Sequence, residues 1–304
     1  MKIALLGPGG VGGLLAGALA RAGSDVVVVA REDTAEHISK HGLHVRSVTL
    51  GDFVARPRAL ARLQEDVDVL IVATKAAGLE AALERIECEP QMVLPQLNGL
   101  DHLAVLRRRF GGGSVLAGAI RVEADRPAPG EIVHTSPFLL VDMAARERAR
   151  GAGMQALGDE LRLAGISVRL GYPITDRSEA EVMWSKLVRL NALACTTSAH
   201  DKLLGEILAT PQLRAELVGA IEEATAVAQA EGAAEASADT ALGELERAHP
   251  TLGSSMQRDI AAGRVPELDA IPGSVLRAGA RHRLSCPTIE LLVEMIEARV
   301  GASA

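Results

Sequence analysis

The chain has 304 residues, a formal net charge of −7, 48% hydrophobic residues and only 2% aromatic residues. This length indicates about two domains, and the hydrophobic content suffices for an ordinary globular core. The negative charge, the scattered arginines and the lack of stacking side chains argue against a nucleic-acid partner. No apolar run reaches the length of a transmembrane helix, so we expect no membrane association.

The three cysteines are Cys88, Cys195 and Cys286. They are far apart, odd in number and in no C-x-x-C pattern, which is typical of a reduced compartment and gives no metal site. The apolar start of the chain runs directly into a glycine loop without a cleavage-type signal. We therefore expect a cytoplasmic protein without a bound metal.

The residues up to Arg31 predict a strand, a glycine-rich turn, a helix and a second strand. The strands are residues 2–6 and 26–29, and helical spacing runs from residue 14 to residue 21. The turn reads Gly7-Pro8-Gly9-Gly10-Val11-Gly12 and contains G-x-G-x-x-G. Between a strand and a helix this motif is typical of dinucleotide-binding domains.

Each part of this loop has its own role in such a site. Gly7 permits the tight turn, Gly9 lets the backbone approach a pyrophosphate, and Gly12 lets the helix pack close to the strand. Gly10 and Val11 open the helix, whose free N–H groups and positive dipole end face the phosphates. A tight turn in any α/β domain is the alternative interpretation.

The residues at the end of the second strand narrow the choice between NAD and NADP as the cofactor. Enzymes that prefer NAD place an acidic residue here, which accepts hydrogen bonds from the ribose hydroxyls. This chain has Arg31 instead, a permanent cation suited to a 2′-phosphate. The pattern therefore favours NADPH/NADP+, although Glu32 or Asp33 would also be placed to face the ribose.

The following segments alternate between strands and helices, which indicates a parallel sheet. We expect a hairpin of residues 43–48 and 51–55, strands at 67–73, 92–94, 115–119, 130–134, 138–142 and 166–170, and helices at 78–86, 103–109 and 154–164.

From Asp176 onward the pattern is helical, with no convincing strand. We expect helices at 179–194, 211–231, 240–248, 254–262, 269–280 and 288–300. Gly171-Tyr172-Pro173 marks the boundary. The fold class is therefore α/β, with a Rossmann-type dinucleotide-binding domain (residues 1–172), an all-helical domain (173–304) and the active site in the cleft between them.

Several local patterns now converge along nearly the whole chain. The glycine loop with Arg31 is followed by Thr74-Lys75-Ala76, Asn98-Gly99, Trp184-Ser185-Lys186-Leu187, Ser254-Ser255-Met256-Gln257-Arg258-Asp259-Ile260 and Glu267-Leu268-Asp269. In this order they resemble the ketopantoate reductase family (2-dehydropantoate 2-reductases). The resemblance implies an NADPH-dependent reduction of a 2-oxo acid to a 2-hydroxy acid, with that acid as the small-molecule partner.

The resemblance also implies roles for single residues. Lys75 matches a lysine near the adenosine phosphate, and Asn98 an asparagine near the nicotinamide and substrate. Lys186 matches the general acid, Ser255 a substrate contact and Glu267 the acidic partner in the site. The chemistry agrees, because reduction of a ketone leaves a developing alkoxide that a lysine ammonium both stabilises and protonates.

Simpler roles stay open for the same residues. Lys186 would also suit the solvated face of an amphipathic helix. Ser254 and Ser255 would cap the following helix, and Glu267 and Asp269 would favour a helix start through its dipole. Asn98-Gly99 is also an ordinary turn signal.

Three positions depart from the family pattern. The family has asparagines one and two turns after the catalytic lysine, where this chain has Leu190 and Ala194. Asn191 is one residue off, about 100° around a helix, and is kept as a substrate-binding candidate. Pro272 replaces a further asparagine. Because a site built for hydroxyl groups discriminates through such donors, we expect a more apolar pocket.

These departures leave alternatives open for the substrate and for the class of protein. The substrate is 2-dehydropantoate or a less polar 2-oxo acid, or a related carbonyl or imine. A non-catalytic NADP-binding sensor on the same fold is the alternative class. The Ala- and Leu-rich helices of the second domain would serve a homodimer interface or only their own core.

Overall fold

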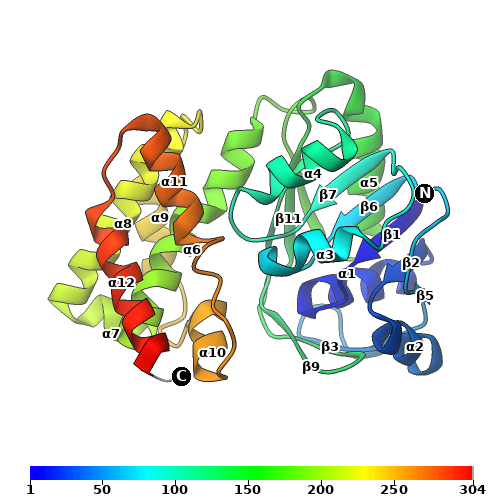
Figure 1. Ribbon diagram of the computed structural model, residues 1–304, viewed down its shortest axis with the longest axis horizontal. Coiled ribbons are helices and arrows are strands. Elements are labelled where there is room, and N and C mark those ends of the chain that lie inside the picture. Colours follow the sequence, from blue (N-terminus) through cyan, green and yellow to red (C-terminus); the bar gives the residue numbers. More distant parts are fainter. Residues whose placement is uncertain (303–304) are drawn as a thin grey trace. The chain divides into compact units, whose positions relative to one another are not determined.

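The computed structural model describes residues 1–302, which form two compact units. Residues 1–97 and 102–182 make up the first unit, and residues 98–101 belong with the chain from Met183 onward. The first unit is α/β and the second is helical, as the sequence predicts (Figure 1).

A five-stranded parallel sheet forms the centre of the first unit. Its order is β5(Arg58–Leu60)-β2(Asp25–Val29)-β1(Lys2–Leu6)-β6(Val69–Val72)-β7(Met92–Pro95). The inner strands read almost entirely as Val, Ile, Leu and Ala because both faces of the sheet are covered. The direction of the strand order reverses between β1 and β6, which is where open α/β sheets bind their ligands.

Two smaller sheets complete this unit. One has the order β4(Phe53–Ala55)-β3(Leu43–Ser47)-β10(Glu131–His134)-β9(Ala124–Ala128), and the other has β12(Ser167–Leu170)-β11(Leu140–Ala144)-β8(Ala117–Arg121). The α-helices are α1(Gly10–Arg21), α2(Glu32–His41), α3(Leu79–Leu83), α4(His102–Phe110) and α5(Gly151–Leu163), with single 3₁₀ turns at Ala76–Gly78 and Arg148–Arg150. Helix α1 contacts β2 and also β3, β4, β9 and β10 of the second sheet, so it is buried on both sides.

A buried ion cluster lies in the third sheet. Asp142 on β11 is fully buried and pairs with Arg169 (2.6 Å) and Arg177 (2.8 Å). Burial raises the pKa of the Asp142 carboxyl, but the hydrogen bond from Arg169 and the charges of both arginines outweigh this and hold the pKa below its usual value. The carboxylate therefore stays ionised inside the fold.

The second unit is made of helices around α8. Its helices are α6(Glu179–His200), which begins in the first unit, α7(Leu204–Ala209), α8(Pro211–Ala230), α9(Ala238–Glu246), α10(Ser255–Ala261), α11(Pro272–His282) and α12(Pro287–Ala302). Helix α8 contacts α7, α9, α11 and α12. Within residues 183–302 no strand occurs, which confirms the prediction that this part of the chain is helical.

The sequence pattern does not predict four elements of the structure, and each omission has a physical reason. Helix α2 buries only Ala35 and Ile38, so its apolar periodicity is weak. Strand β9 contains Pro127 and lies at a sheet edge, where a missing N–H is tolerated. Strand β5 and helix α7 are very short.

Helix α6 also runs further than predicted, to His200. The added turns contain Thr196 and Thr197, whose hydroxyls donate to the backbone carbonyls of Ala192 (2.8 Å) and Leu193 (2.7 Å). Because this back-bonding satisfies the buried hydroxyls, residues with low helix propensity are accommodated in the core.

Candidate active site

The glycine loop has the geometry that a dinucleotide requires. Gly7 has φ +90°, and a Cβ there would lie 2.8 Å from Thr74 Cγ2. A Cβ on Gly12 would lie 2.2 Å from the Gly7 carbonyl oxygen, so only glycine lets α1 approach the end of β1. Gly9, by contrast, has no atom within 4 Å of its Cβ position and leaves open space above the loop. This shape fits a pyrophosphate at the start of α1.

Gly10 has a different requirement from its neighbours. A Cβ on Gly10 would lie 2.3 Å from the carbonyl oxygen of Ala124 on β9. The helix start is therefore covered on that side by backbone, and packing alone accounts for this glycine. Val11, the next residue, is half-buried and packs against the apolar core of the first unit.

The residues after β2 divide into an exposed cation and a paired carboxylate. Arg31 precedes the first residue of α2 and is exposed. Glu32 pairs with the guanidinium of Arg85 through both carboxylate oxygens, at 2.9 and 3.2 Å. This hydrogen bonding lowers the pKa of Glu32 to about 2. Glu32 is thus occupied, whereas Arg31 is exposed at the strand end.

Two buried polar side chains follow β6 and β7 without partners among residues 1–302. They are the Thr74 hydroxyl and the Gln96 amide, of which neither the oxygen nor the nitrogen is hydrogen-bonded. Lys75, next to Thr74, is exposed. Because an unsatisfied buried polar group costs about 1–3 kcal/mol, a polar ligand at this edge of the sheet would be stabilised by these atoms. Gln96 is a candidate that the sequence reasoning missed, although a polar residue directly after a buried strand is a usable signal.

In the second unit, one amide joins the two predicted catalytic residues. Lys186 Nζ donates to Asn98 Oδ1 (2.7 Å), and Asn98 Nδ2 donates to Glu267 Oε2 (3.0 Å). All three side chains are half-buried. The amide is thereby fixed in one orientation, with its oxygen toward the ammonium and its nitrogen toward the carboxylate.

The segment that carries Asn98 is held by close packing and by an arginine. Gly99 has φ +81°, and a Cβ there would lie only 1.9 Å from the carbonyl oxygen of Ala270. Arg277 on α11 pairs with Asp101 (2.5 Å) and with Asp269 (2.7 Å). These contacts tie residues 98–101 to the turn after Glu267. The sequence reasoning assigned no role to Asp101 and Arg277, because no local pattern links them.

The predicted serine pair divides into a cap and an exposed residue. Ser254 precedes α10, and its Oγ accepts a hydrogen bond from Gln257 N (3.0 Å) and donates one to Thr197 Oγ1 (2.9 Å), whose own proton goes to Leu193. Ser255, the first residue of α10, is exposed. Capping is thus the role of Ser254, and Ser255 stays a substrate-contact candidate.

The departures from the family pattern lie on α6 and at the start of α11. Asn191 is fully buried, its Oδ1 accepts from Cys195 Sγ (3.6 Å), and its Nδ2 has no partner in the described chain. Leu190, one turn after Lys186, is half-buried, and Ala194 is buried. Pro272 is the first residue of α11. The helix turn beyond Lys186 therefore presents a leucine instead of an amide.

The described residues contain neither an exposed thiol nor a cluster of potential metal ligands. Cys88, Cys195 and Cys286 are free and buried. Burial raises the pKa of Cys195 to about 12 and, together with nearby carboxylates, that of Cys286 to about 11. No group of three or more potential metal ligands is found in residues 1–302. No described helix combines the length and apolar character needed to cross a membrane.

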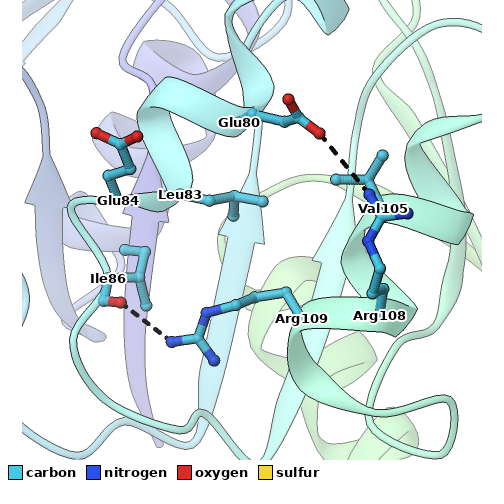
Figure 2. A pocket seen from close by; sticks show the side chains of 7 residues that line it. All are labelled: Glu80, Leu83, Glu84, Ile86, Val105, Arg108 and Arg109. Carbon is cyan, nitrogen blue, oxygen red and sulfur yellow. Dashed lines mark hydrogen bonds and ion pairs between the residues drawn. The ribbon is translucent and has the colours of Figure 1, made fainter.

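A surface hollow lies between α3 and α4, and none of the predicted site residues lines it (Figure 2). It is lined by Glu80, Leu83, Glu84, Ile86, Val105, Arg108 and Arg109. Arg109 donates to the carbonyl oxygen of Ile86 (3.2 Å), and Arg108 pairs loosely with Glu80 (3.7 Å). Its lining thus carries two acidic and two basic side chains.

The strand order and the glycine loop at its switch point define the first unit as a Rossmann-type domain. Comparison with known proteins gives the family. Residues 3–141 match the profile described as "Ketopantoate reductase PanE/ApbA", and residues 180–300 match its C-terminal counterpart. The chain belongs to the ketopantoate reductase family, as the resemblance of its motifs predicts.

Individual relatives cover almost the whole chain. An uncharacterized oxidoreductase of Bacillus subtilis, YkpB, is 30% identical over 98% of this chain and 99% of its own length. The 2-dehydropantoate 2-reductase of Halobacterium salinarum is 26% identical over 97% of this chain and 98% of its own.

Solved structures agree with this fold. The 2-dehydropantoate 2-reductase of Geobacter metallireducens superposes with a TM-score of 0.87 at 25% identity, covering 98% of this chain and 99% of its own. A D-mandelate dehydrogenase solved with NADH and anilino(oxo)acetate also has a TM-score of 0.87, at 21% identity and with 99% of each chain covered.

Proposed function

We propose that the protein is an NADPH-dependent reductase that converts a 2-oxo acid into the corresponding 2-hydroxy acid, with Lys186 as the general acid. The observation that carries this proposal is the chain of hydrogen bonds from Lys186 through Asn98 to Glu267. A half-buried lysine held by a neutral amide, with a carboxylate behind it, is suited to give a proton and to take one back.

The residues of the first unit fit a nicotinamide dinucleotide. The open face of Gly9, the close packing at Gly12 and the unpartnered Thr74 and Gln96 support this fit. Exposed Arg31, with Lys75 as a second cation, would hold a 2′-phosphate, and the pairing of Glu32 with Arg85 supports NADPH over NADH. When bound, the reduced nicotinamide supplies the hydride for the carbonyl carbon.

Lys186 acts on the carbonyl oxygen. Its ammonium donates a hydrogen bond to the ketone, stabilises the charge that develops on this oxygen, and transfers a proton so that the hydroxyl forms. Asn98 orients Nζ by accepting one of its hydrogens, and Glu267 holds the amide from the other side. Lysine then regains its proton from solvent, which balances the reaction of one 2-oxo acid, one NADPH and one proton.

The substrate side chain is expected to be apolar. Leu190 lies one helical turn from Lys186 where family members have an amide, and Ala194 and Pro272 remove two more such groups. Fewer polar donors disfavour a hydroxylated substrate such as 2-dehydropantoate. An aliphatic or aromatic 2-oxo acid suits this pocket better, and one structural neighbour, a D-mandelate dehydrogenase, is named for an aromatic 2-hydroxy acid.

The experiment is an assay of NADPH oxidation with 2-dehydropantoate beside a panel of aliphatic and aromatic 2-oxo acids. We expect turnover of the apolar acids to exceed that of 2-dehydropantoate. The Lys186→Ala variant should lose about 10²–10⁴-fold in kcat while its dissociation constant for NADPH stays unchanged. Tight NADPH binding without turnover of any substrate would favour the alternative, a non-catalytic sensor.

We also propose a cytoplasmic location, which the three free thiols support.

A further inference from the structure

Arg85 joins three segments of the first unit at the edge where β2 ends. It lies in the turn after α3, and its side chain is 23% exposed. Its Nη1 donates to the carbonyl oxygens of Ala61 (3.0 Å) and Ala30 (3.4 Å), and both terminal nitrogens donate to the Glu32 carboxylate. One guanidinium thus fixes the last residue before Arg31 and the first residue after it.

This edge holds two residues with opposite preferences for a cofactor. Glu32 follows Gly12 by 20 residues, the distance at which dinucleotide-binding domains place the residue that reads the ribose. An acidic side chain there accepts hydrogen bonds from the ribose hydroxyls and repels a phosphate, whereas an arginine accommodates the phosphate. Arg31 and Glu32 therefore compete for the same ligand group.

The pairing with Arg85 resolves this competition. Both oxygens of Glu32 are engaged by the fork of the guanidinium, which is the strongest geometry for such a pair. A carboxylate bound in this way has its charge matched and one acceptor site on each oxygen used. It neither offers them to a ribose hydroxyl nor presents an unmatched negative charge beside Arg31.

We propose that Arg85 is a specificity-determining residue that sets the preference for a 2′-phosphate by occupying Glu32. This inference rests on the proposed NADPH dependence and deepens it. Arg85 acts through Glu32, so it is a positioning residue and not a direct ligand of the cofactor. Its loss would leave a free carboxylate beside Arg31, at the place where NAD-dependent enzymes use one.

The experiment measures the dissociation constants of NADP+ and NAD+ by calorimetry for the full-length protein. In Arg85→Met we expect the ratio of the two constants to move toward NAD+ by about tenfold, the equivalent of one charge-assisted hydrogen bond. The double variant Arg85→Met with Glu32→Gln should regain most of the NADP+ preference. This rescue would not occur if Arg85 only stabilised the fold.

Arg109→Met is the matched control. Arg109 also pairs with an exposed glutamate, Glu89 (2.7 Å), and also donates to a backbone carbonyl, that of Ile86 (Figure 2). It has no contact with residues 30–32, so the ratio of the two constants should stay as in the unsubstituted protein.

Other results of the same measurements would contradict the proposed role of Arg85. An unchanged ratio in Arg85→Met, or an equal loss of affinity for both cofactors, would overturn the inference. If that variant does not fold, Glu32→Gln alone decides: NAD+ affinity should not fall, and a fall would mean that Glu32 already contacts the ribose. The NADPH part of the proposed function is tested separately, by the ratio in the unsubstituted protein, and the reductase activity by turnover.

Discussion

The Lys186 ammonium donates to Asn98 Oδ1 across 2.7 Å, although 88 residues separate the two in the chain. The same amide donates to Glu267, so a single side chain links the ammonium to the carboxylate. This hydrogen bond distinguishes Lys186 from a lysine that is merely solvated on the polar face of a helix. The functional interpretation of Lys186 gains its main support here.

Replacing Asn98 should separate orientation from cofactor binding. In Asn98→Ala, Lys186 loses an acceptor that orients Nζ, and we expect kcat to fall about 10²-fold, a larger effect than the change in NADPH affinity. Asn98→Asp would place a second carboxylate 3.0 Å from Glu267, and two such groups raise the pKa of one of them.

The aspartate variant therefore predicts a pH dependence. Below the raised pKa one proton bridges the two carboxyls and activity is partly kept. As the pH rises through that value the carboxyls repel each other, and activity should decline. A pH–rate profile parallel to that of the unsubstituted protein would contradict this account.

Gly99→Ala tests the packing of the segment that carries Asn98. The added Cβ would meet the carbonyl oxygen of Ala270 at 1.9 Å, and the positive φ adds about 1–2 kcal/mol of strain. We expect a lower free energy of unfolding and a loss of turnover, because the peptide carrying Asn98 must move. Gly111→Ala is the control, since it has φ +85° and no atom within 4 Å of the Cβ position. Equal effects of the two substitutions would count against a special role for this contact.

Asp142→Asn should destabilise the first unit. It removes the buried carboxylate that Arg169 and Arg177 bind, and losing a hydrogen bond to a charged group costs about 1.5–3 kcal/mol. Because the folded pKa of Asp142 lies below the ordinary value of 3.8, its contribution is fully present above that pH and is lost as the pH falls through the folded value. Urea unfolding from neutral to acidic pH should show a shallower loss of stability in the variant. Curves that stay parallel down to low pH would refute this assignment.

Leu190→Asn should change substrate preference. The substitution restores an amide one turn after Lys186, where it would bond a substrate hydroxyl. We expect kcat/KM for 2-dehydropantoate to rise by about tenfold relative to an aliphatic 2-oxo acid, which competition assays would measure. Val188→Asn, on the buried side of the same helix, should instead destabilise the protein without this shift.

Local sequence patterns predict much of the fold. The glycine turn lies between β1 and β2 as expected because its spacing is dictated by neighbours in the chain. Lys186 and Glu267 each belong to a short motif, which is how the sequence singles them out as candidates. Helix α2 was missed because it buries only two residues and shows little periodicity.

The connections between these motifs required the structure. Nothing near Asn98 in the sequence indicates that its amide bridges Lys186 and Glu267, and nothing near Arg85 indicates that it pairs with Glu32. Such contacts arise from long-range packing, which no periodicity encodes. For the same reason Arg277, which binds Asp101 and Asp269, has no signature of its own.

The four residues 98–101 belong to the helical unit, although the chain on either side of them belongs to the α/β unit. The sequence of one unit is therefore not sufficient to build the other, because residues 98–101 are encoded within the α/β part of the chain. A helical unit grafted after Val182 from another family member would arrive without the peptide that bridges its lysine and glutamate. Recombination between relatives would keep the original contacts of this short peptide only when it is exchanged together with the distant helices.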